Sequence, residues 1–260
     1  MATCAGWLGT PHPRSRTGLK LGAVVLLVGM VMALVGCQDG GATSTAPEST
    51  GSNPTHAPAV VVIGDSLSTG YGTSPDSAWP HLIDTSNHAT NGTLHVVNAA
   101  QNGSGYATIG DNNSTFGSQV EQSVDANTQL VLFFGSVNDI GTEPAAIAEA
   151  AAAAYAGAKS RAPGAGILAV GPPSYTETPD AGTLAVRDAL VEAAGAAGVT
   201  FVDPIAAGWF LGRVPELVGP DGVHLSKAGQ RYVQAQMTEL IEKCRQTAPT
   251  SGTAIPSQRM

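Results

Sequence analysis

Five short, largely apolar runs most constrain the fold of this 260-residue chain. Each run is five residues long and contains Val, Ile, Leu or Phe at most positions. Runs of this kind, bounded by turn residues, are typical of strands buried on both faces of a sheet. We therefore predict five strands, at residues 59–63, 94–98, 130–134, 166–170 and 199–203.

Helical patterns separate the later runs. Residues 144–161 and 183–197 are rich in Ala, and Pro144 suits a first helical turn. Residues 226–245 begin with Ser226, a good N-cap, and carry spaced apolar residues. Alternation of strand and helix implies a parallel sheet with helices on both faces, joined by right-handed crossovers. We expect the α/β class: a three-layer α/β/α sandwich with a flavodoxin-like, five-stranded parallel sheet.

The first 36 residues have the pattern of a secretory signal peptide. Residues 1–20 carry Arg14, Arg16 and Lys20 and no acidic residue, and residues 21–36 form an apolar run of 16 residues. A membrane span needs about 20 residues, whereas a signal-peptide core is shorter. A single anchoring helix remains the alternative for this run.

The apolar run ends in Leu34-Val35-Gly36-Cys37, which resembles the lipobox of bacterial lipoproteins. In those proteins the Cys receives a diacylglycerol and becomes the mature N-terminus. The resemblance implies lipidation of Cys37, export, and anchoring to the outer face of the bacterial cell membrane through acyl chains. An ordinary signal peptide would leave the protein without this anchor.

The rest of the chain divides into a tether, one domain and a tail. Residues 37–58 are mostly Gly, Ser, Thr, Pro and Ala, which predicts a flexible tether, and residues 246–260 look like a disordered tail. The 187 residues of 59–245 suit one domain with a sizeable core, which we expect to be a monomer. Cys244 would be its only thiol, so no intramolecular disulfide is expected.

The charge of the chain narrows its partners. Loss of residues 1–36 would remove three of the 12 Lys and Arg residues, which leaves nine against 20 acidic residues and a net charge of about −11. An acidic surface argues against nucleic acid as a partner, because phosphate contacts need Lys and Arg. It also argues against electrostatic docking on anionic lipid.

Residues suited to nucleophilic catalysis stand where strands are predicted to end. Ser66 follows the first run, and Asp221 and His224 precede the last helix about 155 residues later. Ligands of such sheets bind beyond the carboxyl ends of the strands. A serine hydroxyl attacks only when a base takes its proton, and His224 with a nearby aspartate can supply that base. The chain is therefore predicted to be a hydrolase.

Four short blocks, in order and each at a strand exit, carry a family resemblance. They are Gly64-Asp65-Ser66-Leu67-Ser68, residues 98–103, Gly135-Ser136-Val137-Asn138-Asp139 and residues 221–225. Over about 60–245 the chain resembles the SGNH branch of the GDSL esterase/lipase family. Its third block is one residue longer than the Gly-x-Asn-Asp of that family.

The resemblance implies a role for each block. Ser66 would be the nucleophile, His224 the general base and Asp221 its orienting carboxylate, while Asp65 would support the loop. The oxyanion hole would consist of the backbone N–H groups of Ser66 and Gly103 and the side-chain amide of Asn138.

Each role has a structural alternative. Ser66 could cap a following helix, although residues 69–72 make a poor first turn. Gly105 competes with Gly103 for the glycine of the second block. Asn138 and Asp221 could both be turn residues.

No metal or cofactor is expected from the sequence. His81, His88 and His95 have no partner at metal-ligand spacing, and only His224 has an acid at a suitable offset. The chain also lacks a phosphate-binding glycine loop and a dinucleotide fingerprint.

The substrate is the least constrained feature. Trp209 and Phe210 could line an acyl or sugar pocket or pack the last helix, and Tyr71, Trp79 and Tyr106 are expected near the crevice. No long amphipathic lid is evident between the first two blocks, which disfavours a lipase for long-chain triglyceride. We expect a serine esterase that acts, through an acyl-serine intermediate, on a small-molecule, glycan or lipid acyl ester, with short chains or O-acetyl groups favoured. The alternatives are an acyltransferase on cell-envelope glycans and a non-catalytic glycan-binding module.

Overall fold

The computed structural model describes residues 59–90 and 94–247. The predicted signal peptide (1–36), the tether (37–58) with Cys37, and residues 248–260 of the predicted tail lie outside the described residues. Within the described ranges, no helix combines the length and the apolar character that a bilayer span requires.

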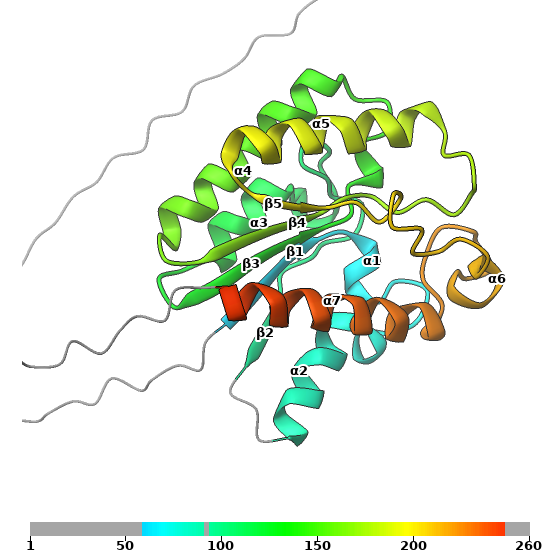
Figure 1. The fold of residues 1–260 in the computed structure, drawn as a ribbon, viewed down its shortest axis with the longest axis horizontal. Coiled ribbons are helices and arrows are strands. Elements are labelled where there is room, and N and C mark those ends of the chain that lie inside the picture. The colour runs from blue at the N-terminus through cyan, green and yellow to red at the C-terminus, as the bar shows by residue number, and fades with distance from the viewer. Residues whose placement is uncertain (1–58, 91–93, 248–260) are drawn as a thin grey trace, which may run out of the picture. The chain divides into compact units, whose positions relative to one another are not determined.

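The five predicted strands form one parallel sheet in the order β2-β1-β3-β4-β5, which is the flavodoxin-like order (Figure 1). This confirms the predicted class and topology. The strands are β1 (Ala59–Gly64), β2 (His95–Asn98), β3 (Thr128–Phe134), β4 (Gly166–Val170) and β5 (Thr200–Val202).

Three of the helices had been predicted and agree within about two residues. They are α4 (Pro144–Arg161), α5 (Ala181–Ala197) and α7 (Lys227–Thr247), and Ser226 caps α7 by accepting the Gly229 N–H. The others are α1 (Ser66–Thr69), α2 (Trp79–Ala89), α3 (Phe116–Ser123) and α6 (Val214–Leu217), with 3-10 turns at Pro75–Ser77, Asp111–Asn113 and Val137–Asp139.

The two faces of the sheet carry separate cores, because side chains alternate along each strand. Val61 and Ile63 of β1 pack with α3, α4 and α5, whereas Val60 and Val62 pack with α2, α6 and α7. Figure 1 shows α4 and α5 on one side of the sheet and α2 and α7 on the other. The protein thus has the three layers expected of alternating strands and helices.

Most of the aromatic residues expected near the crevice are core residues instead. Trp79 is fully buried against Phe134 and donates its indole N–H to Ser68 Oγ at 3.2 Å. Tyr106 is buried, and its hydroxyl bonds that of Tyr155 at 3.0 Å. Trp209 and Phe210 lie in the core with residues of α7, so they pack the last helix and are absent from the lining of the pocket beside Ser66. The expectation for Trp79 and Tyr106 was wrong because both rings enter the cores that flank the sheet.

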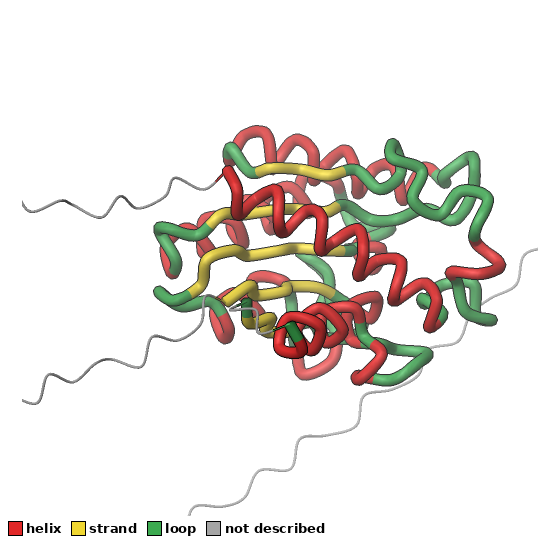
Figure 2. Tube along the Cα trace, turned by 60° about the horizontal axis from the view of Figure 1, so that its bottom comes forward, coloured by secondary structure: helices red, strands yellow, loops and turns green. Residues whose placement is uncertain are grey.

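The loops that follow the strands gather at one end of the sheet (Figure 2). Ser66, Gly103 and Asn138 follow β1, β2 and β3, and His224 precedes α7. Parallel strands therefore deliver residues from distant parts of the chain to one edge.

Candidate active site

Ser66 is the first residue of the single-turn helix α1, directly beyond β1. Asp65, and not Ser66, caps this helix, because its side chain accepts the Leu67 N–H at 2.9 Å. The turn ends at Gly70, whose φ of 82° is left-handed and where an added Cβ would lie 2.2 Å from the Ser74 carbonyl oxygen. The short helix, which the sequence did not favour, thus leaves the Ser66 hydroxyl available to other partners.

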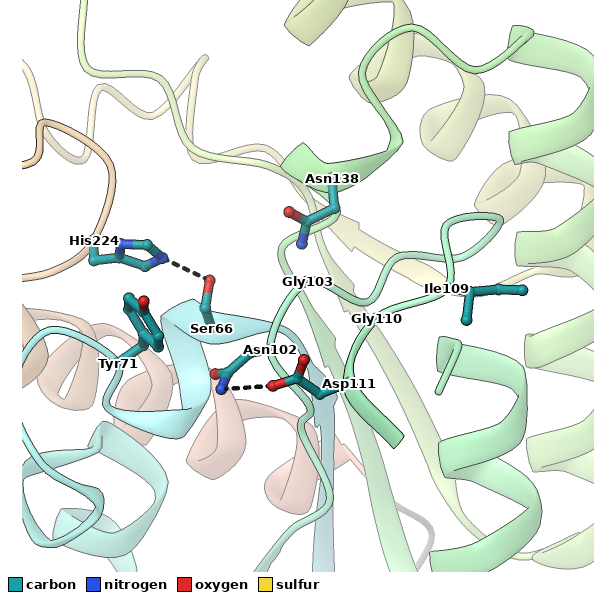
Figure 3. A pocket seen from close by; sticks show the side chains of 9 residues that line it. All are labelled: Ser66, Tyr71, Asn102, Gly103, Ile109, Gly110, Asp111, Asn138 and His224. Atoms are coloured by element: carbon teal, nitrogen blue, oxygen red, sulfur yellow. Dashed lines mark hydrogen bonds between the residues drawn. The ribbon is translucent and has the colours of Figure 1, made fainter. Parts of the chain in front are cut away.

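Ser66, His224 and Asp221 form one hydrogen-bonded path (Figure 3 draws its Ser66–His224 part). Ser66 Oγ lies 3.0 Å from His224 Nε2, and His224 Nδ1 lies 2.7 Å from Asp221 Oδ2. When Nδ1 carries the proton donated to Asp221, Nε2 is an acceptor that faces the serine hydroxyl. The three residues predicted to work together are therefore brought within hydrogen-bond reach.

The aspartate of this path is held in its ionised form. Asp221 Oδ1 accepts the backbone N–H groups of His224 and Val223, each at 3.0 Å. These two bonds, together with the bond from the His224 ring, hold the pKa of Asp221 well below its usual range. On its other side the His224 ring meets the Tyr71 ring, with centroids 4.4 Å apart. The imidazole orientation is thus fixed by the carboxylate and by the aromatic ring.

The three predicted oxyanion-hole residues, Ser66, Gly103 and Asn138, line one pocket with the His224 ring. Asn138 Nδ2 donates to the Ser104 carbonyl at 2.9 Å, which fixes the amide and leaves its second N–H hydrogen available. Within the described part of the chain, the backbone N–H groups of Ser66 and Gly103 donate to no protein acceptor. These donors are the kind that an oxyanion needs.

Gly105, the rival of Gly103, has a different reason to be glycine. An added Cβ there would lie 2.5 Å from the buried Asp139 Oδ1, so Gly105 allows close packing against that carboxylate. Gly103 has a left-handed φ of 72° and lines the pocket, which Gly105 does not.

The extra residue of the third block forms a left-handed bend before Asn138. Gly135 and Ser136 have φ values of 113° and 89°, and positive φ is strained for a serine. The bend is held by Asp65, which accepts the Ser136 N–H at 3.0 Å, and by Asp139, which accepts the Ser136 hydroxyl. An added Cβ on Gly135 would lie 2.3 Å from Asp65 Oδ2, so the bend also brings the backbone against this carboxylate.

Asp139 is a structural residue that the sequence analysis missed. It is fully buried and accepts the backbone N–H groups of Tyr106, Ala107 and Thr108 at 2.7, 3.1 and 2.8 Å. The loop after β2 is thereby tied to the turn that carries Asn138. The adjacent Asn138-Asp139 pair was the only hint of this role in the sequence. An aspartate that closes its own turn and an aspartate that binds a distant loop cannot be told apart from such a pair.

The pocket beside Ser66 has a volume of about 610 Å³ and a largely polar lining. Asn102 Nδ2 donates to Asp111 at 3.2 Å, and Asn102 Oδ1 accepts the Thr69 hydroxyl at 2.6 Å. Asn102 belongs to the second block but had been given no role, and Asp111 and Ile109 were not anticipated, because nothing local in the loop after β2 marks them. The lining consists of Ser66, Tyr71, Asn102, Gly103, Ile109, Gly110, Asp111, Asn138 and His224 (Figure 3).

Two histidines outside the pocket have an acidic partner that the sequence analysis did not recognise. His95 Nδ1 lies 3.0 Å from Asp84 Oδ1, and His88 Nε2 lies 3.5 Å from Asp84 Oδ2. The statement that these histidines lack a partner at metal-ligand spacing was therefore wrong. The helical Asp84–His88 spacing of four residues was visible in the sequence, whereas the approach of His95 depends on the fold.

With this fold and this site, the chain can be placed among known proteins. Residues 62–232 match the model of the GDSL-like lipase/acylhydrolase family, and the chain belongs to that family. It is a carboxylic ester hydrolase.

A relative with high coverage is the GDSL lipase Rv0518 of Mycobacterium tuberculosis, which is 36% identical over 232 residues, 87% of this chain and 97% of the relative. Among solved structures, the psychrotrophic esterase EstA from Pseudoalteromonas sp., inhibited by monoethylphosphonate, superposes with a TM-score of 0.58 at 16% identity, over 73% of this chain and 99% of that one. The acetyl xylan esterase AlAXEase gives a TM-score of 0.58 at 18% identity, over 70% and 99%. At these identities the two structures show the shared fold.

Asp65 should make the stability of the domain depend on pH in a defined direction. Burial raises the pKa of Asp65 from 3.8 to about 6. Because the folded state then holds the proton more tightly, this group favours folding fully below pH 3.8 and loses that contribution as pH rises through about 6. Urea unfolding between pH 4 and 7 should therefore show an added loss of stability with rising pH, at most about 3 kcal/mol.

Asp65→Asn is the control, because it cannot titrate. The substitution replaces the carboxylate oxygen that accepts the Ser136 N–H, so the variant should be less stable than the wild type at every pH. The comparison therefore concerns only how the unfolding free energy of each protein changes with pH. If wild type and variant show the same change in unfolding free energy across this range, the proton on Asp65 has no such role.

Proposed function

We propose that the protein is a serine esterase that hydrolyses short-chain acyl esters through an acyl-serine intermediate on Ser66. The observation that carries this proposal is the path from Ser66 Oγ to His224 Nε2 at 3.0 Å and from His224 Nδ1 to Asp221 Oδ2 at 2.7 Å. Such a path removes the proton from an alcohol that is otherwise a weak nucleophile.

In the first half of the reaction, Ser66 Oγ attacks the ester carbonyl carbon and its proton passes to His224 Nε2. Asp221 remains ionised and stabilises the imidazolium that forms. The tetrahedral intermediate then expels the alcohol oxygen, which takes the proton back from His224 Nε2. The alcohol leaves, and the acyl group remains on Ser66.

In the second half, a water molecule attacks the acyl-serine carbonyl and gives a proton to His224 Nε2. Collapse of this second intermediate returns the proton to Ser66 Oγ and releases the carboxylic acid. The same imidazole therefore serves as base and then as acid in each half.

The negative oxygen of each intermediate would be stabilised by the N–H groups of Ser66 and Gly103 and by Asn138 Nδ2. The Asn138 amide is already held by its bond to the Ser104 carbonyl at 2.9 Å, so little reorganisation is needed when charge develops.

The lining of the pocket favours a short acyl chain and a polar alcohol. Its large apolar side chains are those of Tyr71 and Ile109. Trp209 and Phe210 add no apolar surface to it, because both are buried in the core. Asn102 and Asp111 present an amide and a carboxylate that can bond hydroxyl groups, and a carboxylate disfavours an anionic substrate. An O-acetylated sugar, small or part of a glycan, fits this description.

A fluorophosphonate probe should label Ser66 in the wild-type chain, with the site mapped by mass spectrometry. Ser66→Ala and His224→Ala should abolish both the label and hydrolysis of p-nitrophenyl acetate, since each removes one end of the proton path. Ser174→Ala is a matched control, because Ser174 lies outside the pocket lining, and it should label normally.

Other outcomes would point to other functions. A wild-type protein that neither labels nor cleaves would favour the glycan-binding module. Labelling with acyl groups appearing on an added glycan would favour acyl transfer. A preference for p-nitrophenyl decanoate over the acetate would contradict the short-acyl part of the proposal.

Asn138→Ala should lower kcat by about 10²–10³, with a much smaller change in KM, because the lost bond forms mainly in the transition state. Asn102→Ala is the matched control: its amide lines the same pocket but bonds Asp111 and Thr69, so kcat should change far less. The unfolding temperatures of both variants should also be measured, because a variant that unfolds like the wild type has lost catalytic rate and not folded protein. Equal losses of kcat in the two variants would rule out a special role for Asn138.

We also propose that the protein is exported and anchored by lipid on Cys37, on the basis of Leu34-Val35-Gly36-Cys37 at the end of the apolar run. Cys37→Ser should release the protein from the membrane fraction of a bacterial host and abolish its labelling by radioactive palmitate. Cys4→Ser, which changes the cysteine inside the predicted signal peptide, should leave both unchanged. Full membrane retention of Cys37→Ser would count against the lipid anchor.

A further inference from the structure

Outside the pocket, three side chains from two neighbouring elements form a compact cluster of possible metal ligands. Asp84 and His88 lie on α2 and His95 begins β2, and we call these three residues the α2–β2 cluster. One ligand atom from each residue can be chosen so that all three lie within 4.8 Å of one another. The two ring centroids are 6.3 Å apart.

The distances in this cluster suit a common metal ion. A tetrahedral Zn²⁺ holds its ligands at about 2.0–2.1 Å, which places neighbouring ligand atoms about 3.3 Å apart. Asp84 Oδ1 lies 3.0 Å from His95 Nδ1, and the other carboxylate oxygen, Oδ2, lies 3.5 Å from His88 Nε2. Small side-chain rotations would place all three atoms around one ion.

The carboxylate at the centre of the cluster is already positioned. Asp84 Oδ1 accepts the backbone N–H of Val96 at 2.8 Å, a bond from β2 to the helix beside it. Asp84 is also the least exposed member, at 19% against 62% for His88 and 49% for His95. Two exposed imidazoles thus lie beside one carboxylate that is held by the backbone, and solvent can supply a fourth ligand.

The kind of ligand atom narrows the choice of metal. Imidazole nitrogen suits Zn²⁺ and its transition-metal neighbours, whereas Mg²⁺ and Ca²⁺ prefer sites made of oxygen. Two imidazoles, one carboxylate and an open position match the three-ligand zinc sites of proteins.

We propose that Asp84, His88 and His95 bind one Zn²⁺ ion, with water as the fourth ligand, and that the ion fastens α2 to the edge strand β2. The three residues are absent from the pocket lining, so the ion has a structural effect and takes no part in ester hydrolysis. Because the unfolded chain does not bring these ligands together, bound Zn²⁺ stabilises the folded state.

The test is zinc binding by the full chain in the wild type and in His88→Gln, His95→Gln and His81→Gln. His81 is the matched control, since it is an exposed histidine on the same helix α2 and lies outside the cluster. Isothermal titration with Zn²⁺ alone measures binding, and thermal unfolding with and without Zn²⁺ measures stabilisation. All four proteins should hydrolyse p-nitrophenyl acetate alike in the absence of zinc, which separates this test from that of the proposed function.

Wild type and His81→Gln should bind Zn²⁺ alike and unfold at a higher temperature when it is present. His88→Gln and His95→Gln should each bind at least about tenfold more weakly and lose the rise in unfolding temperature. Zinc-edge anomalous density between the three residues would locate the ion directly. The proposal is overturned if the wild type binds no zinc, or if His88→Gln and His95→Gln bind as the wild type does, which would place the ion at other residues such as His224 with Asp221.

Discussion

Two buried carboxylates hold together the loops on which the candidate active site is built. Asp65 accepts backbone N–H groups from Leu67 and from Ser136, so it joins the exit of β1 to the exit of β3. Asp139 accepts three consecutive backbone N–H groups from the loop after β2 and joins that loop to the same β3 exit. Because a buried carboxylate is costly without such partners, each is bound to a specific arrangement of its neighbours. The positions of Ser66, Gly103 and Asn138 follow from these bonds.

The histidine reaches the site by a separate route. Its loop is closed by the bond of 2.7 Å from Gly219 N–H to the His224 carbonyl and by the antiparallel bridge between Val218 and Leu225. The helix α7, which follows this loop, packs closely on α6. A Cβ added to Gly229 of α7 would lie 2.0 Å from the carbonyl oxygen of Leu217 in α6. Backbone contacts thus position the base independently of the nucleophile, and the parallel sheet brings the two to a common edge.

The sequence predicted those parts of the structure that depend on local patterns. The strands were found because each is a short apolar run, and Ser66, Asp221 and His224 were found because they fall in short blocks at strand exits. The helix α3 was missed because Phe116–Ser123 includes Gly and two Ser residues, and it depends on a capping box at Thr115 and on the burial of Phe116. The bonds of Asp139 to Tyr106, of Asp111 to Asn102 and of His95 to Asp84 could not be predicted, since these partners are 9 to 33 residues away and are brought near only by folding.

The contact between Tyr71 and His224 has a consequence for the charged intermediate of the proposed reaction. Tyr71 is about half exposed, yet its ring centroid lies 4.4 Å from that of the imidazole. The two ring planes are tilted by 44°, and when His224 gains a proton the contact of this cation with the aromatic ring is attractive by roughly 0.5–1 kcal/mol at such an exposed site. The phenol ring also displaces water from one side of the cation and so reduces the screening of its attraction to Asp221. A solvent-facing tyrosine thus gives the imidazolium a second, uncharged source of electrostatic support.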